Sequence, residues 1–214
     1  MKILKFLFIA ATLLPLAGAV SSCSEQDDEE EEYANWQVRN DAVTAEWAAD
    51  SDYQRLKSYA KDATTTGKSS DYIYYMVLDE SDYGDKSTPL FTDTVRVSYR
   101  GRLIPSKTYI DGYVFDQTYL TDDYSPLTAG TADFVVGSTV VGFATALQHM
   151  HRGDRWLVGI PYDLGYGSGT GSSSSIPAYS NLIFDVVLLD FWHPGEKMPS
   201  YKSREMKPKE TKSE

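Results

Sequence analysis

The side chains best suited to binding a metal ion in this chain are three histidines, His149, His151 and His193. His149 and His151 lie two residues apart at the end of an expected helix, where positions i and i+2 do not share a face. Cys23 is the chain's single cysteine, and we expect it to carry lipid, so no set of thiolates completes a site. We therefore expect neither a metal ion nor a cofactor.

Nucleophiles and phosphate-binding loops are no better supported. The chain contains no G-x-S-x-G sequence, which an α/β-hydrolase serine would need. Gly165, Gly167, Gly169 and Gly171 are spaced like a phosphate loop, but serines and Pro177 follow them instead of a helix bearing a lysine. We interpret this segment as a glycine-rich loop. An enzymatic reaction in this chain must then use chemistry without a nucleophile, metal or cofactor.

The pattern of apolar residues from residue 72 onward predicts a mainly antiparallel α+β domain. Val95, Val97 and Tyr99 alternate with polar residues, as in a half-buried strand. Further strands are predicted at Tyr72–Leu78, Phe134–Val136, Trp156–Ile160 and Leu182–Leu189, and a short helix at Gly142–Met150. The composition, 42% hydrophobic residues, is sufficient for a core of this size.

Residues 34–70 precede this domain and are predicted to form a helical extension, from Asn35 to about Asp62, followed by a polar linker at Thr64–Ser70. Trp36, Val43 and Trp47 recur with helical spacing, and Tyr53, Leu56 and Ala60 continue the pattern. Asp50–Asp52 interrupts the pattern and could begin a second helix. Two exposed tryptophans would be unusual. We therefore expect the extension to pack on the main domain, or to pair two copies of the chain as a homodimer.

The N-terminal 22 residues read as a lipoprotein signal peptide. Lys2 and Lys5 precede an apolar stretch that is too short to predict a membrane span. Val20-Ser21-Ser22-Cys23 resembles a lipobox, the site at which bacterial lipoproteins are cleaved before an acylated cysteine. The alternative is an ordinary signal peptide with an incidental cysteine. The resemblance implies a lipid anchor on Cys23 in the cell envelope, at the outer membrane, in a periplasmic or surface-exposed position.

The segment 23–33 is dominated by acidic residues, Glu25 and Asp27–Glu32, and should be a solvated tether. It is either a spacer or, by its similarity to some Gram-negative lipoproteins, a surface-export signal. The formal net charge of −11 makes nucleic acid a poor partner. Residues 193–214 mix lysine, glutamate and proline without an apolar period, which predicts a disordered tail.

Six motif segments follow one another along the second half of the chain. Val95–Gly101 matches V-x-V-x-Y-x-G, and Asp111–Asp116 matches D-G-x-x-F-D. Val140–Phe143 resembles V-I-x-G-W/F, Ile160–Gly167 resembles I-P-x-x-x-A-Y-G, and Ile176–Leu189 resembles I-P-P-x-x-x-L-x-F-D-V-E-L-L. Ala146-Leu147, Met150 and Gly153 continue the helix of the third segment and its end. In this order the segments resemble the FKBP-type peptidyl-prolyl cis-trans isomerases. The resemblance implies a twisted antiparallel sheet wrapped around one short helix over residues 71–192, preceded by the helical extension.

The same resemblance implies a proline-binding pocket. Phe143 takes the place of the aromatic floor, the Val140 N–H that of the donor to a substrate carbonyl, Tyr166 that of the tyrosine that bonds the bound chain, and Asp116 that of the pocket carboxylate. The implied walls are Tyr99, Phe115, Phe134, Ile176 and Phe184. Without the motif order, ordinary core packing would be the preferred explanation of these apolar residues.

Rotation about an X–Pro bond suits such a site because no bond is broken. The barrier, about 18–20 kcal/mol, arises from amide resonance, and the twisted amide has less charge separation than the planar one. A dry apolar pocket should therefore favour the twisted state. The resemblance implies proline-containing polypeptides as substrates and the family's macrolides as inhibitors. The alternatives are a non-catalytic chaperone or proline-peptide binding module, and an envelope adhesion or interaction protein.

Three departures from the family pattern affect the pocket. Phe143 replaces the usual tryptophan, as in many bacterial members. The insertion between Asp116 and Phe134 is long and acidic and contains no Arg or Lys, so it supplies no basic partner for Asp116. The Gly165–Ile176 loop carries serines where members often have a bulky residue or histidine. These changes should alter the rate or the sequence preference.

Overall fold

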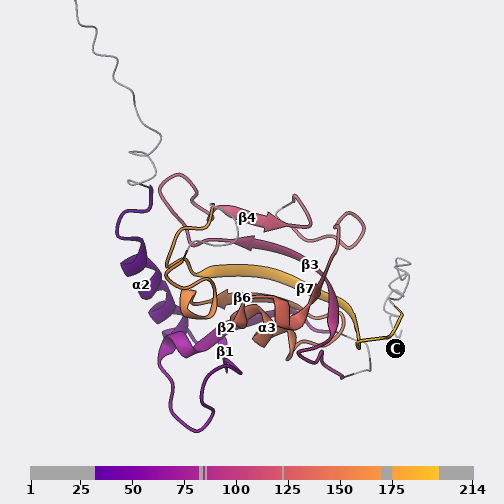
Figure 1. The fold of residues 1–214 in the computed structure, drawn as a ribbon. Coiled ribbons are helices and arrows are strands. Elements are labelled where there is room, and N and C mark those ends of the chain that lie inside the picture. The colour runs from indigo at the N-terminus through magenta and orange to yellow at the C-terminus, as the bar shows by residue number, and fades with distance from the viewer. Residues whose placement is uncertain (1–31, 82–83, 85, 122, 170–174, 198–214) are drawn as a thin grey trace, which may run out of the picture.

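The computed structural model describes residues 32–81, 84, 86–121, 123–169 and 175–197. Its centre is one seven-stranded sheet in the order β1-β2-β6-β7-β3-β4, with β5 also paired to β3 (Figure 1). The strands are β1 (Gln54–Lys57), β2 (Tyr72–Asp79), β3 (Thr94–Arg102), β4 (Val114–Gln117), β5 (Ala132–Val135), β6 (Arg155–Ile160) and β7 (Leu182–Trp192). The helices are α2 (Trp36–Ala49) and α3 (Val141–Leu147), with short 3₁₀ turns η1 (Ser69–Asp71), η2 (Val136–Ser138) and η3 (Tyr162–Leu164).

Every strand pair in the sheet is antiparallel. The longest pairing joins β3 to β7, from Thr94 opposite Trp192 to Arg102 opposite Ile183. Along β3, Val95, Val97 and Tyr99 are buried on the face that packs into the core, as the alternating pattern predicts. β7 continues to Trp192, three residues beyond its predicted end, because its last residues pair with the beginning of β3.

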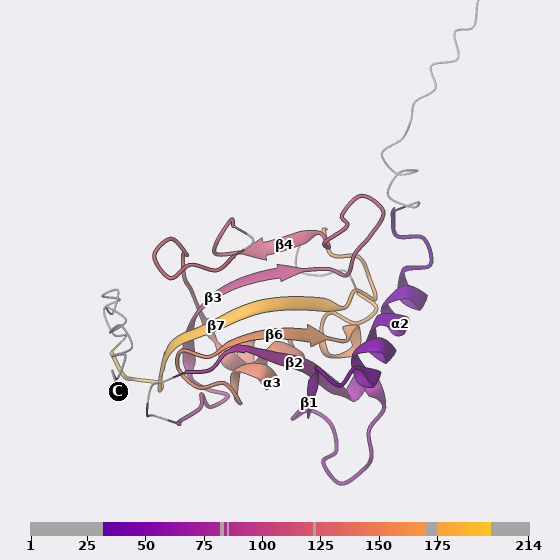
Figure 2. The same ribbon diagram turned by 180° about the vertical axis from the view of Figure 1, so that it is seen from behind.

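Helix α3 packs against one face of the sheet, which Figures 1 and 2 show from opposite sides. Gly142 allows the helix to approach the sheet closely, since a Cβ atom there would lie 2.3 Å from Cγ2 of Ile160 in β6. The helix ends at Leu147 instead of the predicted Met150, although the Met150 side chain is still fully buried. The predicted α+β class, an antiparallel sheet around one short helix, is confirmed.

The prediction of a second helix after residue 50 is wrong. Asp50 takes an extended conformation (ψ 124°) that ends α2, and residues 54–57 then form β1. This strand pairs with β2, from Gln54 opposite Tyr75 to Lys57 opposite Tyr72. Three apolar residues at helical spacing were a weak signal, and pairing with the open edge of β2 overrides it.

A smaller correction concerns the strand predicted at residues 134–136. β5 spans Ala132–Val135, and Val136 begins the turn η2. Val136 is nevertheless completely buried, so its apolar character reflects core packing and not strand pairing.

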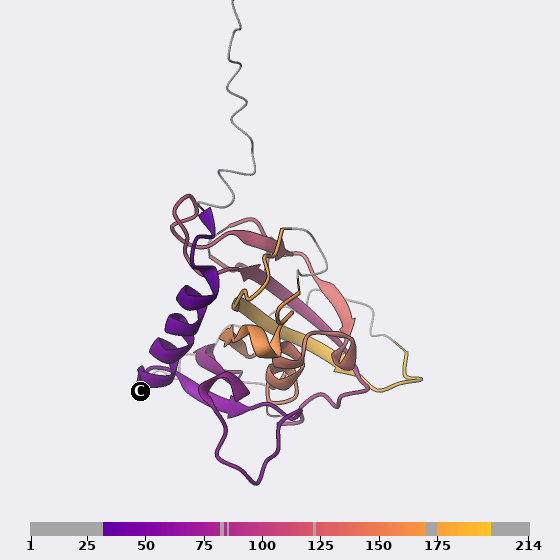
Figure 3. The ribbon, with the colours of Figure 1, turned by 60° about the vertical axis from the view of Figure 1, so that its left-hand side comes forward.

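The extension packs on the main domain, one of the two arrangements expected for it. Trp36 and Trp47 are both buried. Trp47 packs on Gly159 of β6, where a Cβ atom would lie 3.0 Å from the indole. The Trp47 ring also lies 6.0 Å from the ring of Tyr74. Figure 3 shows α2 running alongside the body of the domain. Pairing of two chains through this helix stays a prediction.

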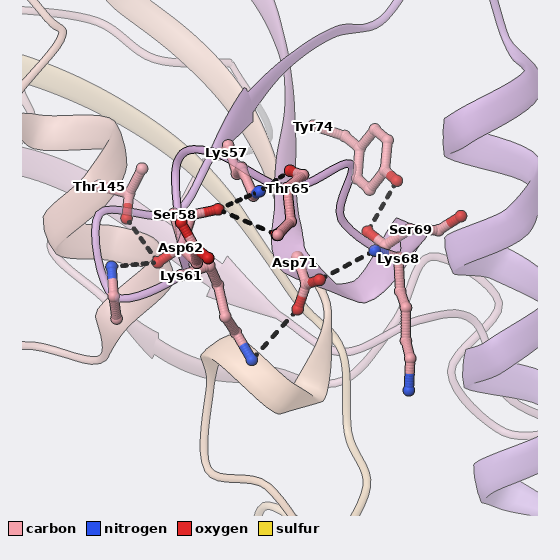
Figure 4. Close-up of polar contacts among 11 residues, drawn as sticks. Lys57, Ser58, Lys61, Asp62, Thr65, Lys68, Ser69, Asp71, Tyr74 and Thr145 are labelled. Atoms are coloured by element: carbon pink, nitrogen blue, oxygen red, sulfur yellow. Dashed lines mark hydrogen bonds and ion pairs between the residues drawn. The ribbon is translucent and has the colours of Figure 1, made fainter.

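The segment between β1 and β2 is held by its own polar contacts, shown in Figure 4. The Lys57 ammonium donates to the carbonyl oxygens of Asp62 and Thr65, and Lys61 lies 3.2 Å from Asp71. Thr145 donates to Ser58 across 3.4 Å, which ties the segment to α3. This polar linker is therefore an ordered part of the domain.

Several predictions lie outside the described residues: the signal peptide, Cys23, residues 23–31 of the acidic tether and residues 198–214 of the tail. Within the described part of the chain, neither helix is long and apolar enough to cross a membrane.

Candidate active site

A cluster of aromatic rings fills the space between α3 and the central strands. Phe143 of α3 and Phe184 of β7 have ring centroids 4.6 Å apart. Tyr99 of β3 lies 6.4 Å from Phe143 and 6.1 Å from Phe184. Phe134 and Phe115 complete the cluster, 5.7 Å from Tyr99 and 5.6 Å from Phe184, respectively. The structure therefore brings together the five aromatic rings of the predicted floor and walls. Tyr166, a further aromatic residue of the predicted site, is described below.

The strand register explains why these rings meet. Gly101 of β3 lies opposite Phe184 of β7 on one side and opposite Asp116 of β4 on the other. A Cβ atom at Gly101 would lie 2.7 Å from the Phe115 ring and 2.8 Å from the Phe184 ring. The absence of a side chain at Gly101 is thus what allows two rings to lie edge to face over β3.

Tyr99 and Asp116 form the polar part of the cluster. The Tyr99 hydroxyl donates to Oδ2 of Asp116 across 2.5 Å. Thr118 fixes the Tyr99 backbone from the same side, because the Tyr99 N–H donates to Oγ1 of Thr118 and the Thr118 N–H donates to the Tyr99 carbonyl. Tyr99 is buried and Asp116 is exposed, so the hydroxyl points from the core toward a carboxylate at the rim.

Burial, followed by the hydrogen bond to Asp116 and the proximity of Asp116 and Tyr166, raises the pKa of Tyr99 above its ordinary value of 10.0. A raised pKa means that the folded chain favours the protonated hydroxyl. The resulting stabilisation is present below pH 10.0 and is lost as the pH rises through the folded-state pKa. At neutral pH the hydroxyl therefore remains a hydrogen-bond donor.

The other predicted residues border the same cluster. Ile176 is buried in the core, and Val140 and Tyr166 are partly buried against it. Val140 precedes α3, where its carbonyl accepts the Ala144 N–H. The Val140 N–H has no hydrogen-bond partner among the described residues, so it is available to a ligand carbonyl.

The three histidines do not form a site. His149, in the turn after α3, contacts the Thr145 carbonyl of that helix at 2.8 Å. His151 lies 3.2 Å from Asp154, and His193 lies 2.8 Å from Asp93. In the described part of the chain, no group of three or more His, Cys, Asp or Glu side chains is arranged to hold a metal ion.

The opposite face of the sheet has a hollow of about 380 Å³, which lies away from the aromatic cluster. Arg100 and Arg102, which alternate with Tyr99 and Gly101 along β3, line it together with Asp185. Asp185 already forms a two-point ion pair with Arg155, at 2.9 and 2.6 Å. The charged, paired lining makes this hollow a poor place for a proline ring.

The insertion after β4 packs over this outer face. Tyr119 is buried, with its ring 5.7 Å from that of Tyr124. The Arg155 guanidinium lies 5.5 Å from the Tyr124 ring. The insertion thus contributes Thr118 to the site, and its aromatic residues cover the sheet instead of entering the pocket.

Sequence reasoning missed two groups of residues that shape the site. The first group is Thr118, which forms hydrogen bonds to the Tyr99 backbone, and Gly101, whose missing side chain leaves room for the rings. Gly101 could have been recognised because it closes the first family motif. Asn40 and Asn181 join α2 to the loop that carries Ile176. Asn40 falls on the same helical face as Trp36 and Trp47, and a buried amide on that face was the available signal.

This combination of an antiparallel sheet, a central helix and an aromatic cluster is the architecture that the family resemblance implies, and comparison with known proteins supports the same family. Residues 85–189 match the family model described as FKBP-type peptidyl-prolyl cis-trans isomerase. The domain at residues 85–189 therefore belongs to that family.

Individual relatives agree with the assignment. The chain is 37% identical over 107 residues to the FKBP-type 22 kDa peptidyl-prolyl cis-trans isomerase of Escherichia coli (strain K12). The matched region covers 50% of this chain and 45% of that protein. The chain is 40% identical over 111 residues to the macrophage infectivity potentiator of Trypanosoma cruzi, covering 52% and 50%. The chain thus spans about half the length of the curated relatives it matches.

A solved structure supports the fold over a longer range. The crystal structure of FkpA from Escherichia coli superposes with a TM-score of 0.53 at 25% identity, covering 78% of this chain and 63% of that one.

The hydrogen bond between Tyr99 and Asp116 can be measured by a double-mutant cycle. We expect Tyr99→Phe and Asp116→Asn each to lower the free energy of unfolding in urea, with a coupling energy of about 1 kcal/mol, because either change removes the same contact. Tyr109, which is 41% exposed, provides the control. Tyr109→Phe should add to Asp116→Asn without coupling, and a Tyr99–Asp116 coupling indistinguishable from this control would contradict the assignment.

Proposed function

We propose that this chain catalyses cis–trans isomerisation of X–Pro bonds in polypeptides without forming a covalent intermediate. The observation that carries the proposal is the buried aromatic cluster around Phe143, with the Tyr99–Asp116 pair at its rim. The membership of the family and the names of the relatives support the same activity.

The pocket would act by excluding water from the reacting amide. The proline ring would lie against Phe143, which is 4% exposed, and beside the rings of Tyr99 and Phe184, which contact it. The imide in this environment loses the hydration that stabilises its charge-separated planar form. The twisted form loses less because it is less polar, so the barrier of about 18–20 kcal/mol is reduced.

Hydrogen bonds would hold the polypeptide while the imide turns. The Val140 N–H is available for a substrate carbonyl, and Tyr166, which packs partly buried against the core, would direct its hydroxyl to the bound chain. Asp116 keeps the Tyr99 hydroxyl oriented and places a negative charge at the rim. Binding energy from these contacts with neighbouring residues would be used to position the proline.

The cellular location we propose follows from the N-terminal pattern. Residues 1–22 would direct export, Cys23 would be acylated, and the acidic tether would hold the domain away from a lipid surface in the cell envelope, at the outer membrane. Exported polypeptides that contain proline would then be the substrates. This proposal rests on the sequence around Cys23.

Isomerase activity is tested with a proline tetrapeptide, in the presence and absence of a macrolide inhibitor. We expect the wild-type chain to accelerate the conversion and the macrolide to block it. Phe143→Leu should lower kcat/KM by about tenfold, because it removes the aromatic floor and its ring contacts.

Phe91→Leu is the matched control, since Phe91 is 44% exposed outside the cluster, and it should retain full activity. A wild-type chain that gives only the uncatalysed rate, yet still suppresses aggregation of unfolded proteins, would replace the isomerase with a binding module or chaperone.

The lipid anchor is tested by Cys23→Ala. We expect the wild-type protein to fractionate with membranes and to incorporate labelled fatty acid, whereas the variant should be released without label, because Cys23 is the only acceptor thiol. Equal membrane association of the two proteins would contradict anchoring through Cys23.

A further inference from the structure

Helix α2 contacts the loop between β6 and β7, which carries Tyr166 and Ile176. We propose that Trp36 and Asn40 of this helix are positioning residues that hold one wall of the proline pocket in place. The inference rests on the proposed isomerase function and deepens it, because it makes the N-terminal extension a part of the site. The two ends of this loop are connected to α2 by separate sets of hydrogen bonds.

The first set leads from Trp36 to Ile176. The indole Nε1–H of Trp36 donates to Oγ of Ser180 across 2.8 Å. The Ser180 hydroxyl in turn donates to the Pro177 carbonyl across 2.7 Å. Pro177 directly follows Ile176, which is 2% exposed. Two consecutive bonds thus connect the helix to the pocket wall, over a separation of 144 residues between Trp36 and Ser180.

The second set consists of two completely buried amides, Asn40 and Asn181. The Asn181 N–H donates to Oδ1 of Asn40 across 2.7 Å, and its Nδ2 donates to the Asn40 carbonyl across 2.7 Å and to Oγ1 of Thr44 across 3.0 Å. Oδ1 of Asn181 accepts the Tyr162 N–H at 2.9 Å. One side chain therefore bridges α2 and the turn η3.

Tyr162 passes this connection on to Tyr166. Its carbonyl accepts the N–H groups of Gly165 and Gly167, at 2.9 and 2.8 Å, which flank Tyr166. Its hydroxyl donates to Asp41 of α2 across 2.8 Å. The two sets of contacts also join each other, since the Tyr179 N–H donates to the Gly167 carbonyl across 2.9 Å.

Such contacts position the loop as well as stabilise it. Loops are ordinarily the more mobile parts of a fold, but here each buried donor would lose its partner if the loop moved away from α2. Small errors in the position of a substrate-contacting side chain reduce catalytic efficiency. Removal of the α2 contacts should therefore weaken substrate binding even where the protein remains folded.

The test compares Trp36→Phe and Asn40→Ala with Trp47→Phe in the full chain. Trp47 is a matched control because it lies on the same helix and is equally buried, but packs on Gly159 and Tyr74, away from the loop. All three changes should lower the melting temperature. We expect only Trp36→Phe and Asn40→Ala to raise KM for a proline tetrapeptide, by about tenfold, with kcat changed less.

A structural readout separates this inference from the proposed function. The methyl signals of Ile176 and the ring signals of Tyr166 should shift in the NMR spectra of Trp36→Phe and Asn40→Ala, and remain in place in Trp47→Phe. If the wild-type chain is inactive but the signals shift in Trp36→Phe and Asn40→Ala, the isomerase proposal is overturned and the positioning role is retained. If the wild-type chain is active and all three variants keep its KM and its Ile176 signals, the positioning role is overturned.

Discussion

The contact between Gly142 and Ile160 is the constraint on which the site depends. A Cβ atom at Gly142 would lie 2.3 Å from Cγ2 of Ile160, so α3 can approach the sheet this closely only where the side chain is missing. The next residue, Phe143, is thereby placed within 4.6 Å of the Phe184 ring. Gly101 has the same function in the sheet, because it leaves room for Phe115 and Phe184. Two glycines thus create the space that the aromatic rings fill.

The polar groups of the site follow from this packing. Tyr99 is buried by the rings, which raises its pKa and keeps its hydroxyl protonated. Its hydrogen-bond partner, Asp116, lies opposite Gly101 and remains exposed. The ionised group is therefore at the rim, where water compensates its charge, and the interior of the cluster contains no formal charge. This separation suits a reaction in which a less polar state must be favoured over a more polar one.

The sequence predicted the features that have a short-range signal. Alternation along Val95–Arg100 identified the central strand, and the ordered motifs identified the five rings that meet in the structure. The strand at Gln54–Lys57 was mistaken for a helix because its pairing partner lies at the edge of a sheet that local periodicity does not reveal. The contacts of Asn40 with Asn181 bridge 141 residues, and no local pattern reports such a separation. They make α2 an integral part of the domain and connect it to the loop beside the pocket.

The central claim is that a proline ring binds against the ring cluster of Phe143, Tyr99 and Phe184. The most direct measurement is an NMR titration of the labelled protein with an X–Pro tetrapeptide, in which exchange between the cis and trans signals of the peptide is recorded in the same samples. The account predicts that the ring signals of these three residues shift first, at peptide concentrations that also produce cis–trans exchange. Shifts confined to the hollow around Arg102 on the opposite face, with the ring signals unchanged, would contradict it.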